Sequence, residues 1–434
     1  MKKWLLLALT LLPSLALAEE VPTLDTGDTA WMMMSAALVL LMTPAGLALF
    51  YAGMTRSKNV LNTYAMVLSA FAVAFIAWIV AGYSMAFGDG GSMQTFMGGF
   101  GNMFLNGIAW NELSGTYPTY VFVVFQGTFA AITVAIAAGS VIERIKFSTW
   151  LVFVFIWTIV VYGPITHMVW GGDGALLFDA GALDFAGGTV VHMNGGLAGL
   201  VLAYLVGKRH GYPKVAMKPM SVMLTALGAA LLWFGWYGFN GGSAFGANEI
   251  AGLAYLTTTL ATAVAALTWV LIEWIVYKKP TLLGAASGVV AGLVSITPAA
   301  GFVDVTGAMI LGAVGSLIAF YGVAFLKKKL GYDDSLDAFG IHFLAGLWGA
   351  LATGVFALND QDLLWDGPLK ATGDRMAQFL VQVESVVVVG IFTLVGTVIV
   401  YYIASAITGG GRVDEETEQQ GLDEAVHGER ALNI

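Results

Sequence analysis

Residues 181–200, GALDFAGGTVVHMNGGLAGL, decide the fold, because they place His192 inside a run that is too apolar for any location but a membrane. Residues 337–351, DAFGIHFLAGLWGAL, repeat the pattern around His342. Aligned on the histidines, the two stretches share small or identical residues at four later positions: Gly195/Ala345, Gly196/Gly346, Leu197/Leu347 and Gly199/Gly349. Two costly ionisable groups in matching contexts predict an internal repeat whose halves build one functional site.

The composition also indicates a polytopic membrane protein. Hydrophobic residues make up 58% of the 434 residues and charged residues 11%, whereas soluble domains carry roughly 25% charge. Glycine occurs 55 times, and small residues let helix backbones approach closely in lipid. The chain has no cysteine, which excludes disulfides, thiolate metal sites and cysteine catalysis. Most of the net charge of −9 lies in loops and the tail, so it does not indicate a nucleic-acid partner.

The first 18 residues have the parts of a secretory signal peptide. Lys2 and Lys3 form a charged start, residues 4–12 an apolar core, and residues 16–18 an A-x-A cleavage site. The mature chain would then begin outside the membrane. The alternative interpretation is an uncleaved additional helix.

Eleven apolar runs are long enough to cross a bilayer, so we expect an all-α polytopic membrane protein. They cover about 29–54, 61–87, 118–142, 147–170, 186–207, 220–240, 250–277, 281–300, 306–326, 338–358 and 377–408. Thirteen lysines and arginines fall in alternate loops, and the other loops hold only Lys370 and Arg375. This asymmetry places the mature N-terminus outside and the C-terminus inside, as an odd number of crossings requires.

Five is also an odd number, so two repeats of five helices would be inverted relative to each other, with the substrate site at their interface. The expected organisation is a signal peptide at 1–18, a transmembrane domain at 19–408 with repeats at about 28–207 and 220–358 and helix 11 at 377–408, and a cytoplasmic tail at 409–434. At 1.5 Å per residue, each histidine lies roughly 6–10 Å deep. The two therefore meet only if vestibules or short helix ends thin the barrier.

The paired histidines allow three interpretations. They could join helices by hydrogen bonds, line a pore as a proton or hydrogen-bond relay, or ligate one haem. No C-x-x-C-H motif is present, and haem would give a Soret band. His167 near a helix end, His210 in a loop and His427 in the tail are expected to be structural or solvated.

Aromatic side chains gather near the outer ends of the expected helices. Phe125 and Phe129 are four residues apart and share a helix face, Trp170 ends a helix, and Phe239 precedes the turn that contains Ser243. Taken singly, tryptophan is typical of the interface belt and phenylalanine of the core. Together they could form a cation–π cage at a pore mouth, with the Ser243 hydroxyl as an acceptor.

Three of the carboxylates in or beside the apolar runs are candidates for a structural or functional role. Asp184 begins a helix and is expected to cap its free N–H groups, while its charge also favours a cation outside the pore. Glu273 and Glu384 lie within helices and need polar partners. No nucleophile–base pair or metal cluster of recognisable spacing is present, so we expect neither an enzyme nor a cofactor.

A set of motifs extends along almost the whole mature length. They are ALFYAG (48–53), FQGTFAAITVAIAAGSVIERIKFS (125–148), HMVWGG (167–172), ALDFAGGTVVHMN (182–194), GWYGFNGGSA (235–244), ANEI (247–250), TPAAG (297–301) and FGIH (339–342). In order, spacing and helix count the chain resembles the Amt/Mep/Rh ammonium transporter family. Trp170 and Ser243 make it similar to Amt rather than Rh members, and the signal peptide resembles that of bacterial members.

The resemblance implies a role for each residue of the candidate cage. Phe125, Trp170 and Ser243 match the family's outer recruitment site for the ammonium ion. Phe129 and Phe239 match the stacked pair that closes the pore below that site.

The resemblance further implies that His192 and His342 are the twin histidines of a narrow apolar pore and that Asp184 stabilises the outer site. Ammonium would be recruited at the cage and deprotonated near the phenylalanines, and ammonia would cross. Ammonium is close to potassium in size, but only ammonium has a proton to lose, and an apolar pore passes a neutral molecule far better than an ion. Whether the proton also crosses, along the histidines, is open at this point.

The family is also similar in its assembly, which implies a homotrimer with one pore per subunit in the bacterial inner membrane. Residues 411–431 resemble the Amt cytoplasmic tail, which helps to dock PII-type signal proteins, whereas residues from Leu432 onward depart from the usual aromatic ending. Judged by composition alone, the tail is either a solvated segment or one that orders against the inner loops or a partner. An ammonium sensor that signals through this tail is the alternative function, and a large signalling domain would support it.

Overall fold

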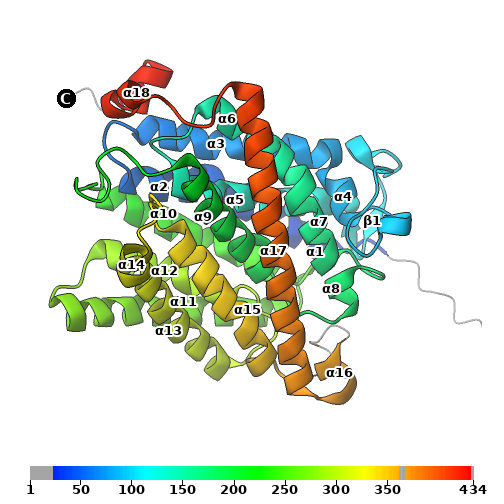
Figure 1. Ribbon diagram of the computed structural model, residues 1–434. Coiled ribbons are helices and arrows are strands. Elements are labelled where there is room, and N and C mark those ends of the chain that lie inside the picture. The colour runs from blue at the N-terminus through cyan, green and yellow to red at the C-terminus, as the bar shows by residue number, and fades with distance from the viewer. Residues whose placement is uncertain (1–22, 361–362, 364–366, 432–434) are drawn as a thin grey trace, which may run out of the picture.

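The computed structural model describes residues 23–360, 363 and 367–431. The expected signal peptide and the residues from Leu432 onward lie outside the described residues. Ten helices in the described part are long and apolar enough to cross a membrane. The longest, α17 (Arg375–Thr408), extends over nearly the full height of the molecule (Figure 1).

The first five of these spans come before residue 207. They are α1 (Thr26–Leu41) with η1 (Met42–Leu47) and α2 (Ala48–Met54); α3 (Val60–Ala77) with η2 (Trp78–Gly82) and α4 (Tyr83–Phe87); α5 (Thr119–Val141); α6 (Phe147–Trp157) with η5 (Thr158–Tyr162) and α7 (Gly163–Trp170); and η6 (Gly188–Met193) with α9 (Asn194–Val206).

The other five spans follow a basic loop. They are α10 (Val222–Trp236) with η7 (Tyr237–Gly241); α11 (Glu249–Tyr277); α13 (Val305–Tyr321) with η8 (Gly322–Leu326) and α14 (Lys327–Leu330); η9 (Phe339–Phe343) with α15 (Leu344–Phe356); and α17. The expected run at 281–300 corresponds to α12 (Leu282–Ile296), a shorter apolar helix of 15 residues. At 1.5 Å per residue α12 is about 22 Å long.

Short elements connect and cap these helices. They are the 3₁₀ turns η3 (Gly91–Met93) and η4 (Met103–Leu105), the hairpin strands β1 (Leu113–Ser114) and β2 (Tyr117–Pro118), α8 (Leu176–Asp179), α16 (Pro368–Thr372), α18 (Glu415–Gln420) and η10 (Asp423–His427).

Several membrane-length helices contain one widened π-helical turn. Pro44 lies within η1, and Pro164 follows η5; proline lacks the N–H that a regular helix would use there. The turns η6, η7 and η9 contain His192, Phe239 and His342 respectively. Such turns are frequent at functional sites because they redirect the side chains that they carry.

The glycines repeated after each histidine let the two histidine-bearing segments approach. A Cβ atom on Gly196 would lie 2.5 Å from the backbone nitrogen of Phe343, and one on Gly346 would lie 3.0 Å from the Gly188 carbonyl oxygen. The backbone distance at Gly196 therefore requires glycine, and a side chain at Gly346 would make a tight contact. The close approach brings η6 beside α15 and η9 beside α9.

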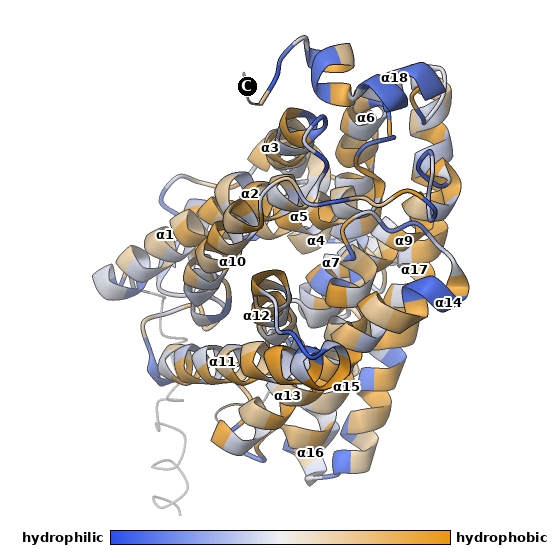
Figure 2. Cartoon of the chain, turned by 90° about the vertical axis from the view of Figure 1, so that its left-hand side faces the viewer, coloured by the Kyte–Doolittle hydropathy of each residue, from blue (hydrophilic) through white to orange (hydrophobic). Residues whose placement is uncertain are grey.

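The helix α5 lies at the centre of the molecule, where it packs against α1, α3 and α9. Nearly all of its residues from Val123 onward are buried. The helix α17 crosses α6, α9 and α15 (Figure 1). Hydrophobic residues cover most of the long helices, whereas α14 and α18 are hydrophilic (Figure 2).

The two membrane-helix glutamates have different surroundings. Glu273 is buried near the end of α11 and accepts hydrogen bonds from the Thr281 backbone N–H (2.7 Å) and hydroxyl (2.9 Å), which connects α11 to the start of α12. Glu384 is exposed on α17.

The tail folds back onto the basic loops. The Leu422 N–H donates to the Asn59 side chain (2.8 Å), and the Asn62 N–H donates to Asp423 (2.8 Å). The carboxylate of Glu418 is buried, accepts the His210 backbone N–H (2.6 Å) and pairs with Arg412. Of the two alternatives for the tail, the described residues thus show the segment ordered against the loops, and they place it at the same end of the molecule as those loops.

A buried ion cluster joins the loops at this end. Glu143 is fully buried and pairs with Arg56 (2.7 Å) and Arg209 (3.1 Å), and Arg209 also pairs with Asp333 (2.7 Å). The Thr55 hydroxyl adds a further hydrogen bond to Glu143 (2.8 Å). Burial alone would raise the pKa of Glu143, but the two guanidinium groups lower it to about 2.

Replacing Glu143 by glutamine is expected to destabilise the protein by about 3–5 kcal/mol, because Arg209 and Arg56 lose a buried counter-charge. The pKa is depressed below the ordinary value of 4.5, so this stabilisation is present above that pH and is lost as the pH falls towards 2. We measure the unfolding temperature in detergent from pH 7 to pH 3. It should fall more steeply with decreasing pH for the wild type than for Glu143→Gln.

The control for this prediction is Glu424→Gln, because Glu424 pairs with Arg430 at half-exposed positions (2.9 Å). Exposed pairs contribute at most about 1 kcal/mol, so this variant should unfold like the wild type. Equal pH slopes for the wild type and Glu143→Gln would show that the buried cluster does not stabilise the fold in this way.

Candidate functional site

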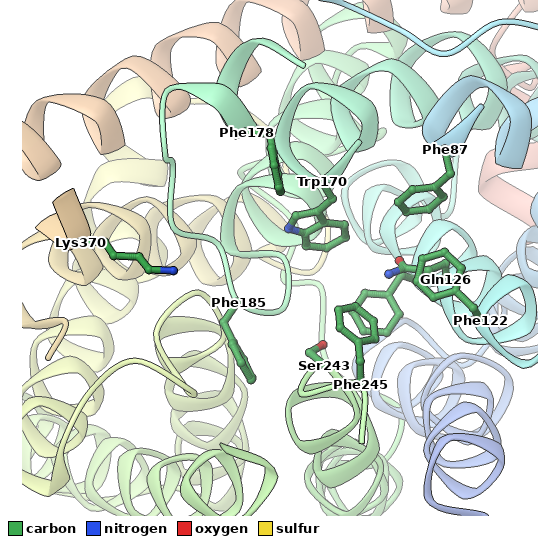
Figure 3. Close-up of a pocket in the computed structure, with 10 residues that line it drawn as sticks. Phe87, Phe122, Gln126, Trp170, Phe178, Phe185, Ser243, Phe245 and Lys370 are labelled. Atoms are coloured by element: carbon green, nitrogen blue, oxygen red, sulfur yellow. The ribbon is translucent and has the colours of Figure 1, made fainter. Parts of the chain in front are cut away.

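A cavity of about 490 Å³ lies where α5, α7 and the turn after η7 meet. Its walls are mostly aromatic, with few polar groups, as is typical of small-molecule sites. The lining residues are Phe87, Phe122, Gln126, Phe129, Trp170, Phe178, Phe185, Ser243, Phe245 and Lys370. Figure 3 shows them around one shared space, which we call the aromatic cavity.

Two of the three expected cage residues line this cavity, and hydrogen bonds hold both of them. The indole N–H of Trp170 donates to the Asp184 backbone carbonyl (2.9 Å). The Ser243 hydroxyl donates to the Phe239 carbonyl (2.8 Å), so its oxygen keeps lone pairs that can accept from a ligand.

The third expected cage residue, Phe125, lies directly behind the cavity wall. It is fully buried and is not among the lining residues. Its ring centroid is 4.8 Å from that of Phe129 and 6.2 Å from that of Phe245. Phe125 therefore supports the two rings that do reach the cavity.

Of the expected phenylalanine pair, Phe129 lines the cavity and Phe239 lies behind it. The rings of Phe129 and Phe239 are stacked, with centroids 4.0 Å apart and planes 18° from parallel. Both are buried. Trp170 packs edge-on against Phe129, with centroids 6.3 Å apart, so one continuous aromatic surface connects the cavity wall to the stacked pair.

The two histidines meet behind the phenylalanine pair. His192 lies 5.8 Å from Phe239 and is stacked on Trp236 at 5.2 Å, measured between ring centroids. The Nδ1 atoms of His192 and His342 are 3.3 Å apart, and both rings are buried. In a hydrogen bond between two Nδ1 atoms one ring donates and the other accepts, so the neutral pair holds opposite tautomers.

Asp184 caps the turn that carries His192. Its carboxylate accepts the backbone N–H groups of Gly187 (3.0 Å), Gly188 (2.5 Å), Thr189 (2.9 Å) and Val190 (3.1 Å), and also the Thr189 hydroxyl (2.5 Å). The expected capping role is therefore present in the structure. Because its carbonyl also holds Trp170, Asp184 connects the cavity wall to the histidine-bearing turn.

Sequence reasoning missed most of the cavity wall. Phe178 lies on the short connecting helix α8, and Phe185 and Phe245 come from loops; only the fold determines the course of these connecting segments. Gln126 carried a usable signal, since a polar side chain within a membrane helix marks a candidate functional residue.

The remaining histidines lie away from the imidazole pair. Both ring nitrogens of His167 are within hydrogen-bond distance of backbone carbonyls, those of Ala86 and Gln94. His210 and His427 lie in the loop and tail region and contact Glu415 and Asn62 respectively.

The geometry does not suit the haem interpretation, because the Nδ1 atoms of His192 and His342 contact each other directly and leave no space for an iron between them. Among residues 23–360, 363 and 367–431, no group of three or more histidine or carboxylate side chains could hold a metal ion.

Fold and site together define a multi-pass membrane protein with an aromatic cavity in front of a buried imidazole pair. The ammonium transporter family matches residues 30–432, and the chain belongs to this family. It is a transporter and not an enzyme.

Relatives in several organisms support this assignment. The chain is 47% identical to an ammonium transporter of Aquifex aeolicus, over 98% of each chain, and 44% identical to one of Bacillus subtilis, over 94% of this chain and 99% of the relative. The crystal structure of Candida albicans Mep2 aligns with a TM-score of 0.82 at 34% identity, over 91% of this chain and 88% of that one. A structure described as a sensor Amt protein aligns with a TM-score of 0.84 at 28% identity, over 92% and 98%.

Proposed function

We propose that the protein takes up ammonium through the aromatic cavity, removes its proton near Phe129 and Phe239, and conducts ammonia past His192 and His342. The observation that carries this proposal is the direct contact between the two Nδ1 atoms immediately behind a stacked phenylalanine pair. Cavity, stacked rings and imidazole pair follow one another along one line of contacts.

The cavity suits a monovalent cation. Trp170 and Phe129 offer ring faces, each contributing on the order of 0.5–2 kcal/mol, and Ser243 offers an acceptor oxygen. Phe125 supports this cage from behind, and Asp184 holds its geometry and adds a buried negative charge. Beyond the stacked pair the surroundings are apolar, where an intact ion costs at least ~2.5 kcal/mol on insertion scales. Potassium has no neutral form and is rejected at this point.

The imidazole pair suits both a relay and a hydrogen-bonding role. Each neutral ring has one donor and one acceptor, so the pair can hydrogen-bond ammonia or pass a proton through its shared Nδ1 contact. If the proton follows this route, transport is electrogenic. If it returns to the outer side, transport is neutral.

We further propose eleven crossings, with α12 as the short one, in two inverted repeats of five followed by α17. The mature N-terminus would lie outside and the C-terminus inside. Support comes from the tail, whose backbone carbonyls accept hydrogen bonds from Lys58 and Lys146 and whose Glu418 carboxylate accepts the His210 backbone N–H. Loops that share one face with the tail are consistent with the positive-inside pattern.

We propose a homotrimer in a bacterial inner membrane, with a PII-type signal protein docking on the tail. Exposed apolar residues on α10 and α11 offer surfaces for lipid or neighbouring subunits; among them are Met223, Leu227, Phe234, Leu256 and Leu267. The mass of the detergent-solubilised particle tests the trimer. The structural neighbour described as a sensor Amt protein keeps signalling through the tail as the second candidate function.

The test is a pulse of ammonium, and then of potassium, on purified protein in liposomes fused to a solid-supported membrane. A transient current for ammonium alone would support proton passage by the histidine route. No current, with internal alkalinisation reported by a pH dye, would support neutral ammonia passage. If neither a current nor alkalinisation is observed, this result would contradict transport and favour the sensor function.

A further inference from the structure

Gln126 is the unexplained polar side chain of the aromatic cavity. Only 3% of its surface is exposed, and its amide oxygen has no hydrogen-bond partner in the described part of the chain. Leaving such a group unpaired in an apolar environment costs about 1–3 kcal/mol, and native proteins rarely do so.

The position of Gln126 relates it to the cavity rather than to the helix packing. It follows Phe125 on α5 and lines the cavity together with Ser243 and Trp170. In Figure 3 its amide lies between Trp170 and Phe122, facing the shared space. Its neighbours on the wall are aromatic rings, which cannot satisfy an amide oxygen with a strong hydrogen bond.

We infer that the Gln126 amide is a second polar ligand for the ammonium ion, acting together with the Ser243 hydroxyl. The inference rests on the proposed function and extends it. Rotation about the last side-chain torsion brings the amide oxygen to the cavity side, where it accepts one N–H of the ion. The ion thereby satisfies the amide oxygen, which has no other partner among the described residues.

A second acceptor changes which cations the cavity prefers. Ammonium has four N–H donors and can serve two oxygens while facing aromatic rings with the others. Methylammonium has three donors and must turn its methyl group towards an apolar wall. An amide on the wall therefore favours ammonium over methylammonium, whereas potassium, which oxygen atoms also bind, is not discriminated at this point.

The test compares Gln126→Leu with the wild type, using ammonium and methylammonium pulses on the full-length protein in liposomes. The half-saturating ammonium concentration should rise roughly tenfold, as for the loss of a hydrogen bond to a charged group. The value for methylammonium should change less than about threefold, because leucine accepts the methyl group. The difference between the half-saturating concentrations of ammonium and methylammonium should therefore decrease.

Two further variants keep the test decisive. Gln126→Met preserves side-chain length without hydrogen bonding and replaces the leucine variant if that one does not fold. Gln420→Leu, at an exposed tail position, makes the same chemical change away from the cavity and should leave both values unchanged. Unchanged ammonium saturation in Gln126→Leu or Gln126→Met, or equal shifts for both substrates, would overturn the inference, while the wild-type signal would still stand. A wild type without any ammonium signal would instead overturn the proposed function, and this inference with it.

Discussion

Alanine in place of His192 is expected to lower the ammonium-evoked current at least tenfold and to weaken the discrimination against potassium. The change removes one half of the 3.3 Å Nδ1 contact and leaves the Nδ1 of His342 without its partner. It also opens space beside Trp236 and Phe239, which water can enter. A hydrated passage no longer excludes an ion by its apolar surroundings. Currents for ammonium and potassium pulses measure both effects.

The double variant, with alanine in place of both His192 and His342, distinguishes a relay from two histidines with independent structural roles. If His192 and His342 act as a unit, removing both should harm transport about as much as removing one, since groups that act together are strongly non-additive. His210→Ala, at an exposed position outside the passage, is the matched control and should behave like the wild type. Wild-type rates together with potassium exclusion in His192→Ala would show that no relay operates.

The sequence was sufficient to predict a helical membrane fold because apolar runs of membrane length carry their own signal. It did not predict the interruptions in the helices. The turns η6 and η9 depend on which partners the backbone N–H and carbonyl groups find after packing. Two other interruptions lie at Pro44 and Pro164, and their positions within the helices are clear only once the helix bounds are known. The order of the tail likewise depends on Asn59 and Asn62, which lie far from it in sequence.

For the candidate site, the sequence identified the groups that repeat or share a helix face, and it underestimated the role of the loops. The expected depth of the histidines allowed a meeting only with a thinned barrier. The structure achieves the contact because η6 begins at Gly188, after an irregular loop, and because Gly196 and Gly346 let the segments approach. Phe185 and Phe245 reach the cavity from such loops, and Phe178 reaches it from the short helix α8. No periodic pattern in the sequence places these side chains.

Asparagine in place of Asp184 is expected to reduce transport at least tenfold and to destabilise the protein by about 3 kcal/mol or more. The carboxylate accepts five hydrogen bonds, four of them from consecutive backbone N–H groups and one from the Thr189 hydroxyl. An amide has only one oxygen, and its NH₂ group would face N–H donors. Each buried donor left unpaired costs about 1–3 kcal/mol. Thermal unfolding in detergent and ammonium-evoked currents on the same preparation measure both consequences.

Stability distinguishes a positioning role of Asp184 from a purely electrostatic one. If its charge alone mattered, Asp184→Asn would unfold like the wild type and would only bind ammonium more weakly. If it positions the turn, stability and transport must fall together, because the turn that it caps carries His192 and its carbonyl holds Trp170. Asp179→Asn is the control, since this exposed carboxylate accepts only the Gly174 N–H among the described residues. Wild-type stability in Asp184→Asn would rule out the positioning role, whatever its effect on the current.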